Sequence, residues 1–312
     1  MKFLKDWMLP IAMTLGAMIF LALHYCPSLD ESAYMSVART VQPVLIGIML
    51  FLQLNVVGPG DLRFHKWHFE LLAVQTVVAF AFAFAAACVQ EGTGRILLEA
   101  AMLCFICPTA AAAGVITSKI GGSLPDILSY TVLIDFVAAL LIPLMVPLVH
   151  PSADAGFLPL FLAIIRKVFA ILVLPTLLAW FIRYAFPGLQ KWLANYVGWA
   201  FYVWSVGLTL AISLATGALV NSGIGVFAAL LIALVSLLCC IFQFWLGRRV
   251  ARSYGRVEEL TAGQSLGQKN TGFLIWLGLS YMTPVTSVAG GLYAVWHNMV
   301  NSYELYRSRH GR

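Results

Sequence analysis

Apolar runs of about twenty residues recur along the chain and decide its fold class. A run of that length can cross a bilayer as a helix, which satisfies its own backbone hydrogen bonds where water is absent. Ten such spans are predicted, at 7–26, 39–57, 69–89, 95–118, 124–149, 168–187, 196–217, 223–246, 258–280 and 284–304. With 61% hydrophobic and only 10% charged residues, the 312-residue chain is predicted to be an all-α polytopic membrane protein. The segment from Phe157 to Lys167 is predicted to be an interfacial lead-in to the sixth span.

Lysine and arginine are distributed unevenly over the predicted loops. With both termini on one side, fourteen of these residues fall on that side and two, Arg39 and Arg95, on the other. The fourteen are Lys2, Lys5, Arg63, Lys66, Lys119, Arg183, Lys191, Arg248, Arg249, Arg252, Arg256, Arg307, Arg309 and Arg312. Because basic loops stay on the cytoplasmic side, we predict a multi-pass protein of the cell inner membrane with both termini in the cytoplasm. This distribution also accounts for the net charge of +6, so the expected partner is the lipid bilayer and not nucleic acid.

Two of the ten predicted spans are interrupted by polar or helix-breaking residues. The ninth contains Gly263-Gln-Ser-Leu-Gly-Gln-Lys-Asn-Thr-Gly272, and the fourth contains Cys107-Pro-Thr-Ala-Ala-Ala-Ala-Gly114. Irregular backbone at membrane depth is tolerated where it is buried in protein or lines a wet cavity, and paired breaks point to a transporter binding site. We therefore predict one membrane domain over 1–312, built from repeats at about 1–150 and 157–312. Five spans in each repeat give a 5+5 inverted repeat, in which the broken helices 4 and 9 cross.

Lys269 is the most unusual residue of the ninth span. A lysine at the centre of a bilayer costs about 2.5–3.5 kcal/mol, so it is expected to be either a functional group or half of a structural ion pair. Asp135, in the fifth span, is its candidate partner. Lys269 could exchange protons or stand permanently in place of a bound cation.

Several amides also lie inside predicted spans, where each needs a partner. Their usual role is to join helices. The clustering of Gln264, Gln268 and Asn270 around the break favours a binding site for the last two. For Gln75, in the third span, both roles stay open.

The remaining motifs give no support to catalysis. The six cysteines lie in or beside apolar spans and are predicted to act as packing residues, including Cys104 and Cys107 despite their redox-like spacing. The histidines lack metal-ligand spacing, and no nucleotide-binding or hydrolase motif is present. We expect no enzymatic activity, no cofactor and no metal site.

The sequences of both interruptions resemble motifs of a known family, the bacterial ten-helix branch of the bile acid:sodium symporters. Cys107-Pro108, the small residues after it and Val115-Ile-Thr-Ser-Lys-Ile-Gly-Gly122 are similar to that family's fourth-helix crossover. Gly267-Gln-Lys-Asn-Thr-Gly272 is similar to its ninth-helix crossover, Gln75 to its third-helix glutamine, and Trp296-His-Asn298 to its tenth-helix ending. The resemblance runs over essentially the whole chain.

The resemblance also reveals substitutions at the positions that bind sodium in the family. Ser265 stands where the family has a glutamate, Lys269 where it has a glutamine, and Ala113-Gly114 where it has Ser-Asn. Gln75 and Thr131 match the family pattern. Most side-chain oxygen ligands are therefore lost, and a lysine ammonium would repel sodium. The expectation is transport without sodium, with Lys269 replacing the cation and the proton as the more plausible coupling ion.

By the same resemblance, spans 1, 2, 6 and 7 form a panel that moves against a core of spans 3–5 and 8–10. The implied function is secondary transport, by alternating access, of a small organic anion such as a steroid-like acid or a small carboxylate. The substrate would lie at the crossover, close to Thr109, Ala111, Ala112, Gly114, Gln268 and Asn270. A membrane sensor that kept the fold without transporting is the alternative, and an auxin-carrier-like protein ranks below it.

Overall fold

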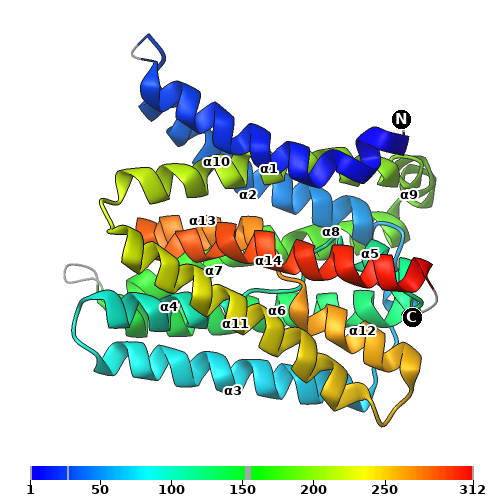
Figure 1. Ribbon diagram of the computed structural model, residues 1–312. Coiled ribbons are helices and arrows are strands. Elements are labelled where there is room, and N and C mark those ends of the chain that lie inside the picture. The colour runs from blue at the N-terminus through cyan, green and yellow to red at the C-terminus, as the bar shows by residue number, and fades with distance from the viewer. Residues whose placement is uncertain (1, 27, 152–155, 311–312) are drawn as a thin grey trace.

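The structure is a computed structural model that describes residues 2–26, 28–151 and 156–310 (Figure 1). Within these ranges the chain forms fourteen α-helices and two short 3-10 helices, with a single bridged residue pair as its only strand-like feature. The helices are α1 (Lys2–Tyr25), α2 (Glu31–Leu54), α3 (Lys66–Cys88), α4 (Thr93–Ile106), α5 (Ala113–Lys119), α6 (Leu124–Val149), α7 (Phe157–Leu172), α8 (Leu174–Ala185), α9 (Pro187–Ala194), α10 (Ala200–Asn221), α11 (Val226–Ala251), α12 (Arg256–Gly267), α13 (Thr271–Tyr281) and α14 (Pro284–Arg309). The all-helical fold class is thereby confirmed.

Several of these helices are long and apolar enough to cross a membrane. Five described elements qualify, namely α2, α3, α6, α11 and the segment Val197–Asn221 that contains α10. The pair α7 and α8 would make a sixth span if it is counted as one bent element. Pro10–Tyr25 and α13 are apolar but shorter. The membrane class is supported on this basis, and ten spans stay a prediction.

One face of α11 has the large, exposed apolar side chains that a lipid-facing surface requires. Its exposed side chains recur every three or four residues and are large and apolar: Leu230, Leu234, Leu238, Ile241 and Trp245. The opposite face, with Cys240, Gln243 and Phe244, is buried against the protein. An apolar stripe of this length is costly in water and favourable in hydrocarbon.

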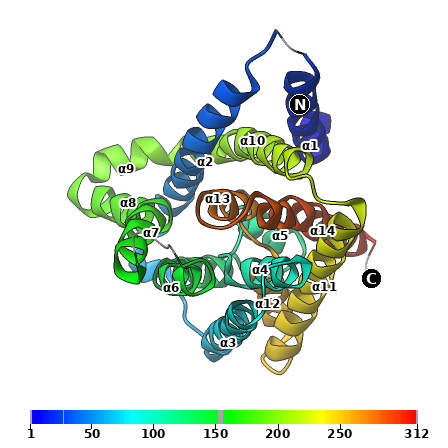
Figure 2. The ribbon, with the colours of Figure 1, turned by 90° about the vertical axis from the view of Figure 1, so that its left-hand side faces the viewer.

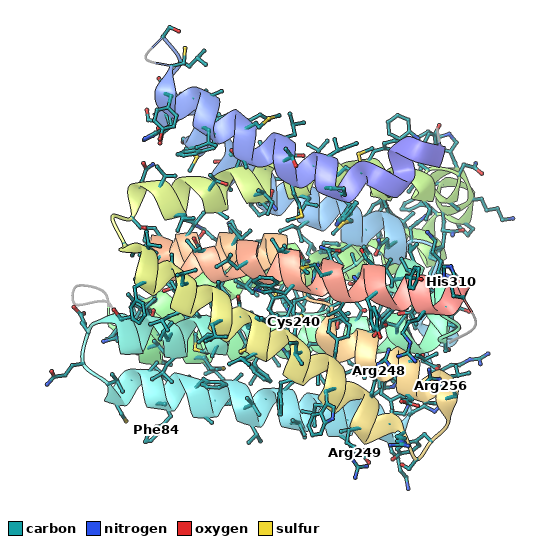
Figure 3. The ribbon with its side chains drawn as sticks, in the orientation of Figure 1. Phe84, Cys240, Arg248, Arg249, Arg256 and His310 are labelled. Carbon is teal, nitrogen blue, oxygen red and sulfur yellow. The ribbon has the colours of Figure 1, made fainter. Side chains whose placement is uncertain are left out.

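The helices pack as a group around α10 and a larger group around the paired breaks (Figure 2). Helix α10 packs on α1, α2 and α14, while α2 also contacts α8. On the other side, α3 packs on α4 and α6, and α11 packs on α12 and α14. Arg248, Arg249, Arg256 and His310 gather at one end of the helices, and Phe84 lies toward the other (Figure 3).

The sixth predicted span differs from the structure. The sequence places its start at 168 and treats Phe157 to Lys167 as interfacial, but α7 runs unbroken from Phe157 to Leu172. The chain then bends by 45° into α8. Pro175, in the first turn of α8, explains the break, because proline lacks a backbone donor and clashes with the preceding helical turn.

Candidate functional site

The two interruptions lie against each other. Helix α4 ends at Ile106 and α5 begins at Ala113, while α12 ends at Gly267 and α13 begins at Thr271. Between them, Thr109 and Lys269 form an isolated antiparallel bridge. The N–H of Ala110 donates to the carbonyl of Gln268 at 3.0 Å, and the N–H of Asn270 donates to the carbonyl of Pro108 at 2.9 Å. This pairing, which we call the chain crossing (residues 107–112 and 268–270), satisfies backbone groups that the helix ends leave open.

Local sequence explains why the helices stop there. The residue before a proline avoids the helical region, and Cys107 accordingly has a ψ of 132°. Side chains then hold the two segments together. The Cys107 thiol donates to the carbonyl of Asn270 at 3.1 Å, and the Thr109 hydroxyl donates to the carbonyl of Ser265 at 2.6 Å. The Tyr293 hydroxyl donates to the carbonyl of Gly267 at 2.8 Å, so α14 is tied to the crossing as well.

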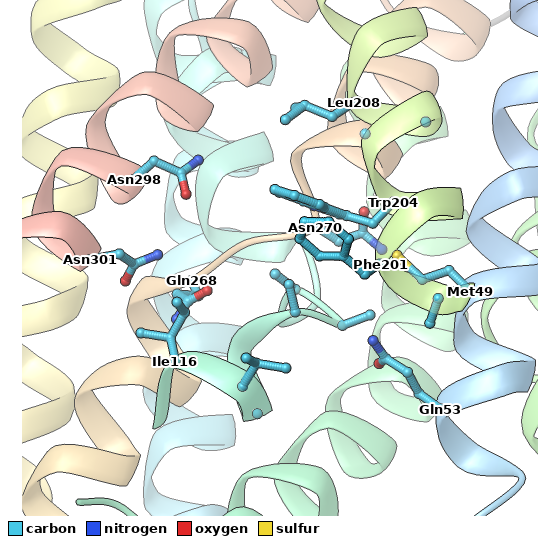
Figure 4. A pocket seen from close by; sticks show the side chains of 18 of the residues that line it. Met49, Gln53, Ile116, Phe201, Trp204, Leu208, Gln268, Asn270, Asn298 and Asn301 are labelled. Atoms are coloured by element: carbon cyan, nitrogen blue, oxygen red, sulfur yellow. The ribbon is translucent and has the colours of Figure 1, made fainter. Parts of the chain in front are cut away.

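A cavity of about 900 Å³ lies beside the chain crossing. Its apolar wall comes from α2 and α10, where Met49, Phe201, Trp204 and Leu208 face inward (Figure 4). Its polar wall comes from the crossing, α2 and α14, with the amides Gln42, Gln268, Asn270, Asn298 and Asn301. The cavity extends to the helix end that carries Lys119, Tyr306 and His310. One cavity thus joins a large apolar surface to a cluster of amides.

The predicted site residues fall into two groups around this cavity. Those that line it are Ala111, Ala112, Gly114, Gln268, Lys269 and Asn270. Those that are buried without lining it are Gln75, Thr109, Ala113, Thr131, Asp135 and Ser265. The hydroxyl of Thr109 is occupied by the crossing itself, so Thr109 supports the site and does not face it.

Asn270 is both a structural cap and a free donor. Its Oδ1 accepts from the N–H of Phe273 at 3.2 Å, which caps the start of α13. This bond fixes the orientation of the amide, and its Nδ2 has no hydrogen-bond partner among the described residues although the side chain is only 6% exposed. A buried amide donor without a partner costs free energy, which a ligand acceptor would recover.

Lys269 is 1% exposed and lacks an acidic partner in the described part of the chain. Its Nζ donates to the carbonyl of Phe105 at 3.4 Å, and its backbone N–H donates to Nδ1 of His297 at 3.4 Å. The candidate ion pair with Asp135 is not formed, and Asp135 Oδ2 has no hydrogen-bond partner among the described residues. Phe105 belongs to α4 and does not line the cavity, so the ammonium is held behind the cavity wall by a backbone carbonyl.

The role of Gln75, which the sequence does not decide, is to hydrogen-bond the chain crossing. Its Nε2 donates to the carbonyl of Cys107 at 3.3 Å, and its Oε1 accepts from the hydroxyl of Tyr130 at 2.9 Å. Thr131 donates to the carbonyl of Ile127 within α6 at 2.8 Å. Ser265 differs, since its hydroxyl has no hydrogen-bond partner in the described ranges. Gln75 and Thr131 thus have structural bonds already.

The polar face of α14 was not assigned to the site from the sequence, although Trp296-His-Asn298 belongs to the family resemblance. His297, Asn298 and Asn301 line the cavity, and Glu304 lies one turn further along the same helix. Their spacing of one, three and three residues places them on neighbouring turns, a helical period that could have been recognised. Gln42 was missed for a different reason, because it is a single amide close to Arg39 and Thr40 at the start of the predicted second span. Its Oε1 has no hydrogen-bond partner among the described residues.

A scan against models of protein families finds no match for this chain, and a search of curated proteins finds none either. The resemblance to bile acid:sodium symporters therefore rests on the residues of the two crossovers together with Gln75 and Trp296-His-Asn298, and it stays a prediction. In the described ranges, no three His, Cys, Asp or Glu side chains are placed to hold a metal ion. The cavity presents amide donors and acceptors and an apolar wall, and the ammonium of Lys269 is buried behind it.

Proposed function

We propose that this protein is a secondary transporter of an organic anion that works by alternating access. The observation that carries the proposal is the chain crossing, at which a free amide donor (Asn270) borders one large cavity and an ammonium without an acidic partner among the described residues (Lys269) is buried in the same segment. Two broken helices that meet in this way are the arrangement on which membrane transporters build substrate sites. In this proposal α4 with α5 and α12 with α13 are the broken fourth and ninth spans of a ten-span inverted repeat.

The cavity's size and lining suit an amphipathic anion. A volume of about 900 Å³ lies near the upper end for small-molecule sites, and such sites combine apolar walls with a few convergent polar groups. The rings of Phe201 and Trp204 would receive an apolar body, such as a steroid or acyl chain. The donor of Asn270 would receive the acidic group.

Lys269 supports transport without sodium. Its ammonium occupies a position that the family resemblance assigns to a sodium ligand, and two like charges about 4 Å apart repel by about 4 kcal/mol at an effective dielectric of 20. The same charge attracts an anion to the cavity. Lys269 would thus do permanently what a bound cation does in sodium-coupled relatives.

The packing is compatible with alternating access. Helices α1, α2 and α10 pack on one another, and the cavity lies between α2 and α10 on one side and the elements of the crossing on the other. Movement of α2 and α10 against the crossing would open and close the cavity. If the basic end of the helices is cytoplasmic, the cavity extends toward the cytoplasm in this state.

Ligand-dependent stability tests the binding half of the proposal. We expect taurocholate, cholate or octanoate to raise the thermal midpoint of the purified protein, while the uncharged cholamide and octanamide do not. A ligand at 100 times its Kd stabilises by about 2.7 kcal/mol, so the shift is measurable. The increase should be equal in sodium chloride and choline chloride. A rise that needs sodium would contradict the proposed role of Lys269, and no rise with any of the acids would contradict the proposed substrate class.

A further inference from the structure

A chain of hydrogen bonds leads from the cavity wall to the basic end of the helices. Gln268 Nε2 donates to Gln264 Oε1, and Gln264 Nε2 donates to Glu304 Oε2 at 2.5 Å. Glu304 Oε1 in turn accepts from Nη2 of Arg248. The two amides belong to α12 and its C-terminal cap, Glu304 to α14 and Arg248 to α11. We call these four residues the relay.

The relay connects two cavities through the protein interior. Gln268 lines the large cavity, and Gln264 between the cavities is fully buried. Glu304 and Arg248 line a second cavity of about 220 Å³, which Arg256, Arg307 and Ser308 also border. Arg248 and Arg256 lie at the basic end of the helices (Figure 3), so water can reach Glu304 from that side.

The direction of every bond in the relay follows from the charge of Glu304. An ionised carboxylate only accepts hydrogen bonds, so Gln264 must turn its NH2 group toward Glu304. The carbonyl oxygen of Gln264 then faces Gln268, which must offer its own NH2 group. This leaves Oε1 of Gln268 for the cavity, and Figure 4 shows that oxygen on the cavity side. An amide oxygen that faces the cavity is unfavourable beside an anion, because both are hydrogen-bond acceptors.

We propose that protonation of Glu304 reverses the relay and makes the proton the coupling ion of anion transport. The inference rests on the proposed function, because it concerns how the same cavity binds its anion. A proton from water in the small cavity binds Glu304 Oε2, and the new O–H donates to Gln264 Oε1. Gln264 Nε2 then donates to Gln268 Oε1, and Gln268 Nε2 faces the cavity as a donor. Both amides turn by half a rotation, Arg248 keeps its bond, and the number of hydrogen bonds is unchanged.

Thermodynamic linkage then couples proton binding to anion binding. If the anion binds better when Glu304 is protonated, the proton binds better when the anion is present, by the same factor. The groups that face Glu304 are Arg248 from α11, Arg256 from α12 and Arg307 from its own helix, and the carbonyl of Lys119 on α5 accepts from the nearby Ser308. Arginines stay charged at any pH that the protein tolerates. His297 of α14 and His310 at its C-terminal cap also line the large cavity, so the Glu304 variant decides whether a change in mild acid reports on Glu304.

The affinity for taurocholate at two pH values tests the relay, since its sulfonate stays ionised at both. Isothermal titration of the wild type is expected to give binding at least about tenfold tighter in mildly acidic than in mildly alkaline buffer. Tenfold corresponds to about 1.4 kcal/mol, which is within reach of one hydrogen bond to a charged group. An affinity of the wild type that does not depend on pH would overturn the relay and leave the proposed function intact.

Three variants localise the effect. In Glu304→Gln the new amide donates to Gln264 as a protonated carboxyl would, so tight binding is expected at both pH values. Gln264→Leu cuts the relay and should remove the pH dependence. Glu70→Gln, which changes a carboxylate that accepts from the Tyr254 hydroxyl at 2.9 Å outside both cavities, should keep the wild-type ratio. Wild-type pH dependence in Glu304→Gln would overturn the assignment.

Infrared difference spectra of the ligand-free protein test the relay without any bound anion. If none of the anions binds, the proposed substrate class is rejected, but the spectra still show whether Glu304 and the glutamines change together. On acidification we expect the band of a protonated carboxyl, together with a shift of isotope-labelled glutamine side-chain bands. Glu304→Gln should lose both changes, whereas Gln264→Leu should keep the carboxyl band. Spectra in which Glu304→Gln matches the wild type would contradict the relay.

Discussion

Replacing Lys269 with methionine is expected to weaken anion binding at least about thirtyfold without lowering the thermal midpoint. A unit charge about 8 Å from the anion contributes about 2 kcal/mol at an effective dielectric of 20, which is roughly thirtyfold in affinity. Stability should be equal or higher, because the buried ammonium is held by the carbonyl of Phe105 and by no carboxylate of the described residues. An uncompensated buried charge is costly, and methionine fills a similar volume.

Titration calorimetry and a melting curve check both halves of this prediction. Lys191→Met removes the same charge from an exposed position on α9, outside the cavity, and should bind taurocholate as the wild type does. If Lys269→Met instead lowers the midpoint and keeps the affinity, Lys269 has a structural role and the proposed site loses its cation.

Asn270→Asp is expected to reduce anion affinity more than about hundredfold while the fold stays stable. The aspartate keeps an oxygen for the cap on the N–H of Phe273, because aspartate and asparagine cap helices about equally well. It replaces the free Nδ2 donor with a carboxylate oxygen, so an attraction becomes a repulsion between like charges. The loss of a hydrogen bond to a charged group alone is worth about 1.5–3 kcal/mol.

Two companion variants separate the roles of this side chain. Asn270→Ala removes the cap as well as the donor and should cost about 1 kcal/mol of stability. Asn298→Asp adds the same charge to the cavity, but the Asn298 amide already donates to the carbonyl of Ala294 at 2.7 Å, so its effect should be smaller. Equal losses at both positions would mean that only net charge matters and that Asn270 makes no direct contact.

The interruptions of the helices could be predicted from sequence because their causes are local. Pro108 prevents Cys107 from staying helical, and the polar stretch that ends at Gly272 cannot remain an unbroken span in hydrocarbon. The pairing between the breaks is different. The bridge of Thr109 with Lys269 joins residues far apart along the chain, and only the packed helices fix that register.

Other features depend on distances that a sequence does not contain. Asp135 was the obvious partner for Lys269 by charge, yet α6 does not bring it into an ion pair. The bond between Gln264 and Glu304 could not be predicted either, because it joins two separate helices and Glu304 stands at the very end of the last predicted span. In α7, the charges of Arg166 and Lys167 predict a segment at the membrane interface. The helix nevertheless continues through them to the bend before Pro175.

Uptake of radiolabelled taurocholate into proteoliposomes tests the central claim most directly, because it separates a transporter from a sensor that only binds. With the wild type we predict uptake above that of protein-free vesicles at equal rates in sodium and in choline buffer, and uptake at the background level with Lys269→Met. Uptake by the wild type that requires sodium would contradict the replacement of the cation by Lys269. Binding without any uptake would contradict transport itself.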